Sequence, residues 1–129
     1  MHSILKQLFD AQATNAVSDP ENVDNYQHLV VAIDSAGSAA LRVQILGSIQ
    51  DTPPDFSAAQ AADNQYEALQ LKDLQSGASL DGDTGLLLSG TDDHRLFEVN
   101  TNQVKWVAAK VSSRTAGTVT VLLRASANY

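Results

Sequence analysis

The chain has 129 residues, of which 43% are hydrophobic and 18% are charged, and its formal net charge at pH 7 is −7. This length suits one domain with a core that needs no covalent staple, and the ordinary composition excludes disorder of the whole chain. The negative charge opposes binding to nucleic acid and to anionic membranes. The absence of cysteine excludes disulfides, thiol catalysis and thiolate metal sites.

The first ten residues predict a short amphipathic segment. Ile4 and Leu8 are four residues apart, as are Leu5 and Phe9, and this spacing favours a helical turn, with an extended strand as the alternative. Polar residues interrupt the apolar ones, so no secretory signal is expected. Because a segment of this length is not stable alone, it needs a docking surface. That surface is either the protein's own core or a neighbouring subunit, and the four apolar residues are interface candidates.

Residues 11–25 are polar and form a turn-rich entry to the domain. From residue 26 onward, apolar and polar residues alternate with the period of two that a half-buried strand shows. Residues 34–38 have the composition of a hairpin connection, and Pro53-Pro54 places residues 50–66 in a long loop. The predicted strands cover residues 26–33, 39–48, 67–72, 85–89, 94–99, 104–112 and 117–126.

This pattern predicts an all-β protein with a single antiparallel β-sandwich that resembles a jelly roll. The whole chain, residues 1–129, is expected to form one domain. Within it, residues 1–25 are an N-terminal helical or extended arm with its turn-rich entry, and residues 26–127 are the sandwich. No stretch approaches the roughly 20 apolar residues of a membrane-spanning helix.

The sequence offers no catalytic constellation, and we expect neither an enzyme nor a bound cofactor. It has no Gly-x-Ser-x-Gly elbow, and no feature selects a pair of carboxylates across a cleft. The acidic residues of two nearby turns could attract calcium, but Asp and Gly are also ordinary turn residues, and no metal site is assigned. These acidic residues are Asp81, Asp83, Asp92 and Asp93. The histidines, which nothing in the sequence brings together, are His2, His28 and His94.

Three large apolar residues lie on the polar side of their strands. Trp106 alternates with Ala108 and Lys110, Leu122 lies among the threonines of its strand, and Leu96 opposes its apolar neighbours. An outward Trp can anchor an interface or stack on a sugar, whereas a rim Trp packs with its N–H satisfied. If the three residues cluster, they form a contact patch.

Several segments resemble small virion proteins of tailed bacteriophages. In such proteins a strand ending in Gly-Ser leads to a long loop, and a late Gly-Thr-Val-Thr-Val strand closes a sandwich. The resemblance covers roughly residues 26–127, and its motifs carry no catalytic residues. The matching segments are residues 47–56, 81–85, 97–102, 106–107 and 116–121.

The resemblance implies a structural protein of a phage particle, assembled in the host cytoplasm and located in the virion. A capsid accessory or decoration protein is expected first, with other virion proteins, notably the major capsid protein, as partners and a homo-oligomer as the assembly. A neck or tail accessory protein is the alternative within this class. From another class, the alternative is a carbohydrate-binding module with Trp106 as its platform.

Overall fold

The computed structural model describes residues 2–100 and 104–127, and its described elements are all β-strands in one antiparallel sheet. The sheet order is β1-β10-β4-β9-β6-β7, with short strands added along β4 and β10. The strands are β1 (His2–Gln12), β2 (Ala16–Val17), β3 (Glu21–Asn22), β4 (His28–Ser48), β5 (Glu67–Ala68), β6 (Leu71–Asp73), β7 (Ser79–Leu80), β8 (Leu86–Ser89), β9 (His94–Val99) and β10 (Trp106–Ala127). In the described part of the chain, no helix is long and apolar enough to cross a membrane.

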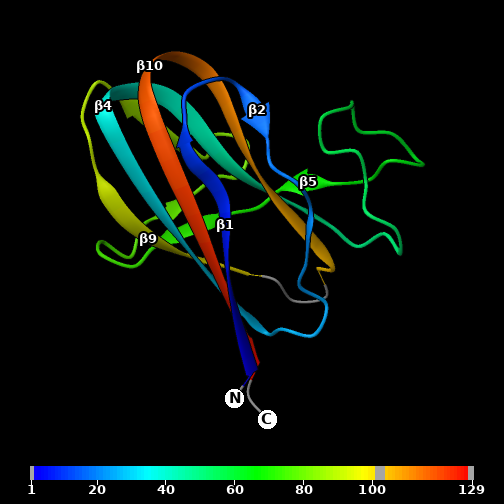
Figure 1. The fold of residues 1–129 in the computed structure, drawn as a ribbon. Coiled ribbons are helices and arrows are strands. Elements are labelled where there is room, and N and C mark those ends of the chain that lie inside the picture. Colours follow the sequence, from blue (N-terminus) through cyan, green and yellow to red (C-terminus); the bar gives the residue numbers. More distant parts are fainter. Residues whose placement is uncertain (1, 101–103, 128–129) are drawn as a thin grey trace.

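Two long strands, β4 and β10, run through the whole molecule and pair with each other almost throughout their length. Both bend near their middles, where the chain adopts positive φ angles: 75° at Gly37, 54° at Ser38, 54° at Ser113 and 78° at Gly117. Figure 1 shows both strands turning at the top of the view and returning behind the front strands. The bends divide the sheet into a first half around β1, β9, His28–Ser35 and Thr118–Ala127, and a second half around β5, β8, Ala39–Ser48 and Trp106–Ser112.

One apolar cluster lies inside the bent sheet and joins its two halves. Leu29, Val31 and Ile33 come from the first half of β4, and Leu41 and Val43 come from the second half. All five are at most 1% exposed. The alternation that the sequence shows in the last strand is confirmed, because the core also contains Val119, Val121, Leu123 and Ala125.

The all-β antiparallel prediction is confirmed, but the jelly roll and the division into two separate sheets are not. The strands remain one hydrogen-bonded sheet because β4 and β10 continue through the bends. Residues 34–38, predicted as a hairpin connection, are a bend within β4. Residues 26–33 and 39–48 are therefore not partners, and β10 pairs with both segments.

The N-terminal segment is an extended strand, so the predicted helical turn is wrong. β1 pairs with β10 from His2–Ala127 to Gln12–Val119, with register shifts between Gln7 and Phe9 and between Phe9 and Gln12. Ile4 and Leu8 share the core side by the period-two alternation of a strand, and the first shift turns Phe9 to the core as well, whereas Leu5 is exposed. The connection expected between the predicted strands at residues 94–99 and 104–112 lies partly outside the described residues.

Candidate interaction surface

The outer face of the first half of the sheet carries two of the predicted interface residues in one row. The strand register places Leu122 of β10 and Leu96 of β9 on either side of Ala32 in β4. Leu96 is 51% exposed, and Leu122 and Ala32 are half-buried. Leu74, which is also exposed, joins this row through its backbone N–H, which donates to the Leu96 carbonyl at 3.0 Å. The structure therefore brings Leu96 and Leu122 onto one apolar strip.

A second row on the same face combines apolar and charged residues. It runs from Leu5 in β1 through Arg124 and Val30 to Glu98 and Lys72 in β6. Leu5 is 63% exposed, and the Arg124 guanidinium donates to Ser3 Oγ at 3.3 Å. In Figure 1, β1, β10 and the first half of β4 lie side by side at the front of the view, with no loop drawn over β10 or that half of β4. We call the two rows together the open face.

The other N-terminal interface candidates pack on their own chain. Phe9 is 7% exposed and belongs to the main core cluster, and Ile4 and Leu8 pack against that cluster. Among the apolar residues of β1, Leu5 is the one that contributes to the open face. The structure therefore uses most of this segment as part of the domain's own core.

Trp106 lies far from the open face, in a second apolar cluster on the outer side of the other half of the sheet. It packs with Leu46, Phe56 and Ala108, and its indole N–H donates to the Gln50 carbonyl at 3.0 Å. The rings of Phe56 and Tyr66 meet edge to face with centroids 5.3 Å apart. Residues 49–66 thus fold over this half of the sheet, and Trp106 is a half-buried packing residue with a satisfied N–H.

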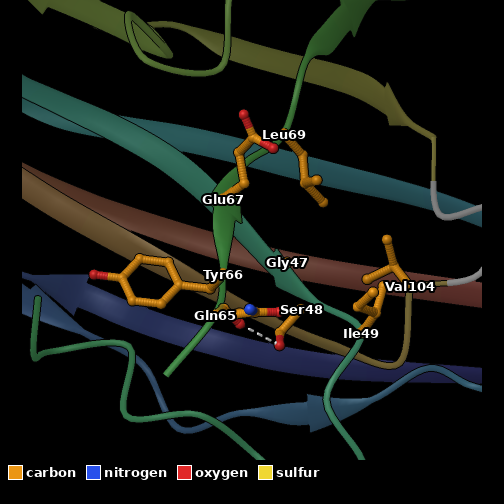
Figure 2. Close-up of a pocket in the computed structure, with 8 residues that line it drawn as sticks. All are labelled: Gly47, Ser48, Ile49, Gln65, Tyr66, Glu67, Leu69 and Val104. Carbon is orange, nitrogen blue, oxygen red and sulfur yellow. Dashed lines mark hydrogen bonds between the residues drawn. The ribbon is translucent and has the colours of Figure 1, made fainter. Parts of the chain in front are cut away.

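A pocket of about 270 Å³ opens beside this covering loop. Figure 2 shows Leu69 and Val104 facing the same space above the backbone of Gly47, and Ile49 lies beside Val104. A Cβ atom on Gly47 would lie 2.8 Å from Leu69 Cδ1, so a larger residue there would displace the Leu69 side chain. The Ser48 hydroxyl donates to the Gln65 carbonyl at 2.5 Å and joins the two ends of the loop.

The acidic turn at residues 81–85 is held by side chains of β4. The guanidinium of Arg42 donates to the carbonyls of Asp83 and Thr84 at 3.1 and 2.9 Å, and the Gln44 amide donates to the carbonyls of Gly82 and Asp83. A cation placed at these carbonyls would meet the positive charge of Arg42. These hydrogen bonds hold the turn against β4.

The second acidic turn crosses the bend of β4. The Ser35 N–H donates to the Asp93 carbonyl at 2.9 Å, the Asp93 N–H donates to Ser35 Oγ at 2.8 Å, and the Ala39 N–H donates to Asp92 Oδ1 at 3.2 Å. The Gly90 N–H also donates to the Ala39 carbonyl at 2.9 Å. The turn thus bonds to β4 on both sides of Gly37 and Ser38, and we call it the bend latch.

Arg95 pairs with two carboxylates beside the bend latch. Its Nε lies 2.7 Å from Asp93 Oδ2, and its Nη1 bonds to Asp73, whose side chain is 8% exposed. The Arg95 side chain holds the pKa of Asp93 below its ordinary value. The pKa of Asp73 is lowered chiefly by the Gln75 backbone N–H; burial raises it, and the charge of Arg95 contributes a smaller lowering. This network joins β9 to the end of β6.

The histidines are not brought together. His94 Nδ1 lies 2.9 Å from Asp34 Oδ1 in an exposed pair, and His28 lies at the start of β4. Among the residues that the structure describes, no group of three or more metal-ligating side chains could hold an ion. The side chain of His2 lies outside the description.

Sequence reasoning missed Val30, Ala32, Arg124 and Glu98 as members of the candidate surface. Their positions depend on the pairing of β4 with β9 and β10, which are distant in the sequence. The alternation in residues 26–33 does show that Val30 and Ala32 oppose the buried residues. That local signal could have identified them as outward apolar residues, although not their neighbours.

Comparison with known proteins shows which solved structures have a fold similar to that of this chain. No family model and no curated protein matches the chain. Solved structures do match over nearly its whole length, and two of them are phage-derived proteins. The bent sheet is therefore a fold that phage-derived proteins share.

The first of these structures is the SPBc2 prophage-derived protein YomS. It matches with a TM-score of 0.71 and 13% sequence identity, over 96% of this chain and 92% of that protein. The second is the PBSX exported protein XepA, with a TM-score of 0.70 and 14% identity over 96% of this chain. This chain spans 37% of the length of that second protein.

Proposed function

We propose that this chain is a structural protein of a bacteriophage particle, and specifically a capsid accessory or decoration protein. The observation that carries the proposal is the fold, which two phage-derived proteins share at TM-scores of 0.71 and 0.70. The open face supports it, because a strip of outward apolar residues beside charged residues is typical of protein contact surfaces. The role needs no catalytic residues.

The proposed mechanism is stabilisation of the shell by binding. A protein that binds the assembled shell and not its dissociated subunits shifts the equilibrium toward the shell by mass action. The major capsid protein is the proposed partner, and the virion is the proposed location. The net charge of −7 keeps the free protein soluble before it binds.

The test is the composition of purified particles of the phage whose genome encodes this chain. Quantitative mass spectrometry should find the protein in amounts comparable to the major capsid protein. Particles that lack it should release their DNA at a lower temperature, and adding the purified protein should restore the wild-type temperature.

Other results would redirect or end the proposal. A few copies per particle would contradict a decoration role and favour a neck or tail accessory protein. Complete absence from the particle would contradict a structural role in the virion. Binding on a glycan array that Trp106→Ala abolishes would favour the carbohydrate-binding alternative, although Trp106 is half-buried among packing partners.

A further inference from the structure

The open face has a self-complementary pattern about its middle strand. In one row Arg124 of β10 and Glu98 of β9 flank Val30 of β4, so opposite charges lie on opposite sides of the strand. In the next row Leu122 and Leu96 flank Ala32 in the same way. The residues of β4 itself are small and half-buried. If a second copy is rotated by 180° about an axis parallel to β4, its open face places complementary residues opposite those of the first copy.

We propose that the open face packs against the same face of a second copy of this chain, with a two-fold axis along β4. Rotation about that axis places β10 of one copy against β9 of the other. Arg124 then meets Glu98 of the partner subunit, and Leu122 meets Leu96 of the partner subunit. Val30 and Ala32 lie on the axis and meet their own copies. Each of the two contacts between β9 and β10 occurs twice, as an isologous interface requires.

The positions of Arg124 and Glu98 favour a second copy of this chain as the partner of the open face. Arg124 and Glu98 are both exposed, so each is available to a partner. Opposite charges placed across an interface determine register and exclude wrong partners. A flat partner of a single sign would face repulsion from one of the two residues, whereas a second copy satisfies both.

The size of the open face predicts a dimer of moderate affinity. Five strands, separated by four spacings of about 4.8 Å, and eight residues of about 3.4 Å rise give a face of roughly 19 Å by 27 Å. Two such faces in contact would together bury about 1,000 Å² if both are treated as flat. That area lies between crystal contacts and standard stable interfaces, so we expect a micromolar dissociation constant.

The edges of the contact are defined by neighbouring residues. Asp34 is the next outward residue of β4 after Ala32, and it would face Asp34 of the partner subunit. Like charges repel there, which disfavours close contact at this end of the strand. Because each sheet twists, the two faces diverge away from Val30 and Ala32 at their centre. Asp34 therefore lies at the solvated rim, and the contact centres on Val30 and Ala32.

Sedimentation velocity of the full chain at neutral pH, from about 1 to 200 µM, tests the dimer. The wild type should pass from monomer to dimer over this range. Arg124→Glu and Glu98→Arg should each weaken dimerisation at least tenfold, because each places like charges together. The double variant should recover most of the affinity, because the pair is restored with reversed signs.

A matched pair of leucine variants separates the open face from the rest of the surface. Leu96→Glu should abolish dimerisation, whereas Leu87→Glu should leave it unchanged. Leu87 is similarly exposed, at 56%, but it lies on β8 in the other half of the sheet. Circular dichroism of each variant confirms that it is folded.

Two results would overturn the dimer. One is a wild type that stays monomeric at 200 µM, and the other is a double charge reversal that fails to recover affinity although both single variants weaken it. The inference does not rest on the proposed phage role, because particle composition and self-association are measured separately. A monomeric wild type whose Leu96→Glu variant no longer joins the particle would assign the open face to another virion protein.

Discussion

At the scale of single residues, Arg95 contributes to how the protein responds to acid. It bonds to Asp73 and Asp93, and both carboxyls have pKa values below the ordinary 3.8. Carboxylates with a lowered folded pKa stabilise the fold fully above the unfolded value and lose that contribution as the pH falls through the folded value. The network therefore stabilises the protein above about pH 4 and weakens below it.

Replacing Arg95 with Gln tests this network. We expect Arg95→Gln to lower the melting temperature at pH 7, where Asp73 keeps its charge and loses its partner. The difference from wild type should shrink as the pH falls from about 5 to 2, because both carboxyls become protonated. Thermal melts at pH 7, 5, 4, 3 and 2 measure it. A difference that stays constant with pH would show that Arg95 acts through packing alone.

Trp106 gives a second prediction at this scale. Trp106→Ala should lower the free energy of unfolding by about 3 kcal/mol, because the half-buried ring leaves a gap among Leu46, Phe56 and Ala108. Trp106→Phe retains an aromatic ring and loses the N–H bond to Gln50, so it should cost about 1 kcal/mol. Urea denaturation followed by circular dichroism measures both. Equal costs for the two variants would contradict a packing role.

At the scale of elements, the bends of β4 and β10 depend on glycine at one contact. Gly117 has φ of 78°, and a Cβ there would lie 2.4 Å from the Cα of Ala39 and 2.7 Å from the carbonyl oxygen of Ala36. Neither backbone atom can move without opening the bend. Gly117→Ala should therefore cost about 3 kcal/mol or more in stability.

Gly77→Ala is the matched control for this prediction. Gly77 has φ of 75°, and a Cβ there would have no atom within 4 Å. The variant should cost about 1 kcal/mol, from backbone strain alone. Chemical denaturation of both variants gives the comparison, and similar costs at the two positions would show that the close approach of the bends is unimportant.

β1 gives a prediction about its own two faces. Phe9→Ala should lower the free energy of unfolding by about 3–4 kcal/mol, because Phe9 lies in the core. Leu5→Ala, measured at low protein concentration, should cost less than about 0.5 kcal/mol, because Leu5 is exposed. Denaturation curves of the two variants measure both changes in the free energy of unfolding. A small effect of Phe9→Ala would indicate that β1 is a detachable arm.

The elements also show how far local pattern predicts this fold. The strands predicted at residues 85–89 and 94–99 are confirmed, and the inward face of residues 119–125 follows from alternation alone. The bend at Gly37 has the composition of a hairpin turn, and nothing local distinguishes a bent strand from a reversed one. The distinguishing fact is that β10, some 80 residues later, pairs with both halves of β4.

At the scale of the whole molecule, the shared core predicts one cooperative unfolding transition. β4 and β10 contribute to both halves, so neither half can unfold while the other keeps its core. Fluorescence of Trp106, the one tryptophan, reports on the second half and its covering loop. Circular dichroism reports on the sheet. Their urea transitions should coincide, and two separated midpoints would show independent halves.

The candidate surface was predictable only in part at this scale. Strand alternation identified Leu96 and Leu122 as outward residues, but it grouped Trp106 with them. Trp106 lies 16 residues before Leu122 on the same strand, beyond the bend, under the loop of residues 49–66. The direction of a side chain follows from local sequence, whereas the identity of its neighbours follows from the pairing of distant strands.

The pairing of β1 with β10 has a mechanical consequence. His2 lies opposite Ala127, so the two ends of the described chain are neighbours in the sheet (Figure 1). A force pulling these ends apart would act perpendicular to the strands and break the ladder one pair at a time. A force spread over the open face would instead load many strands together. We therefore expect a lower unfolding force when the protein is pulled by these two ends than when the force is applied across the open face.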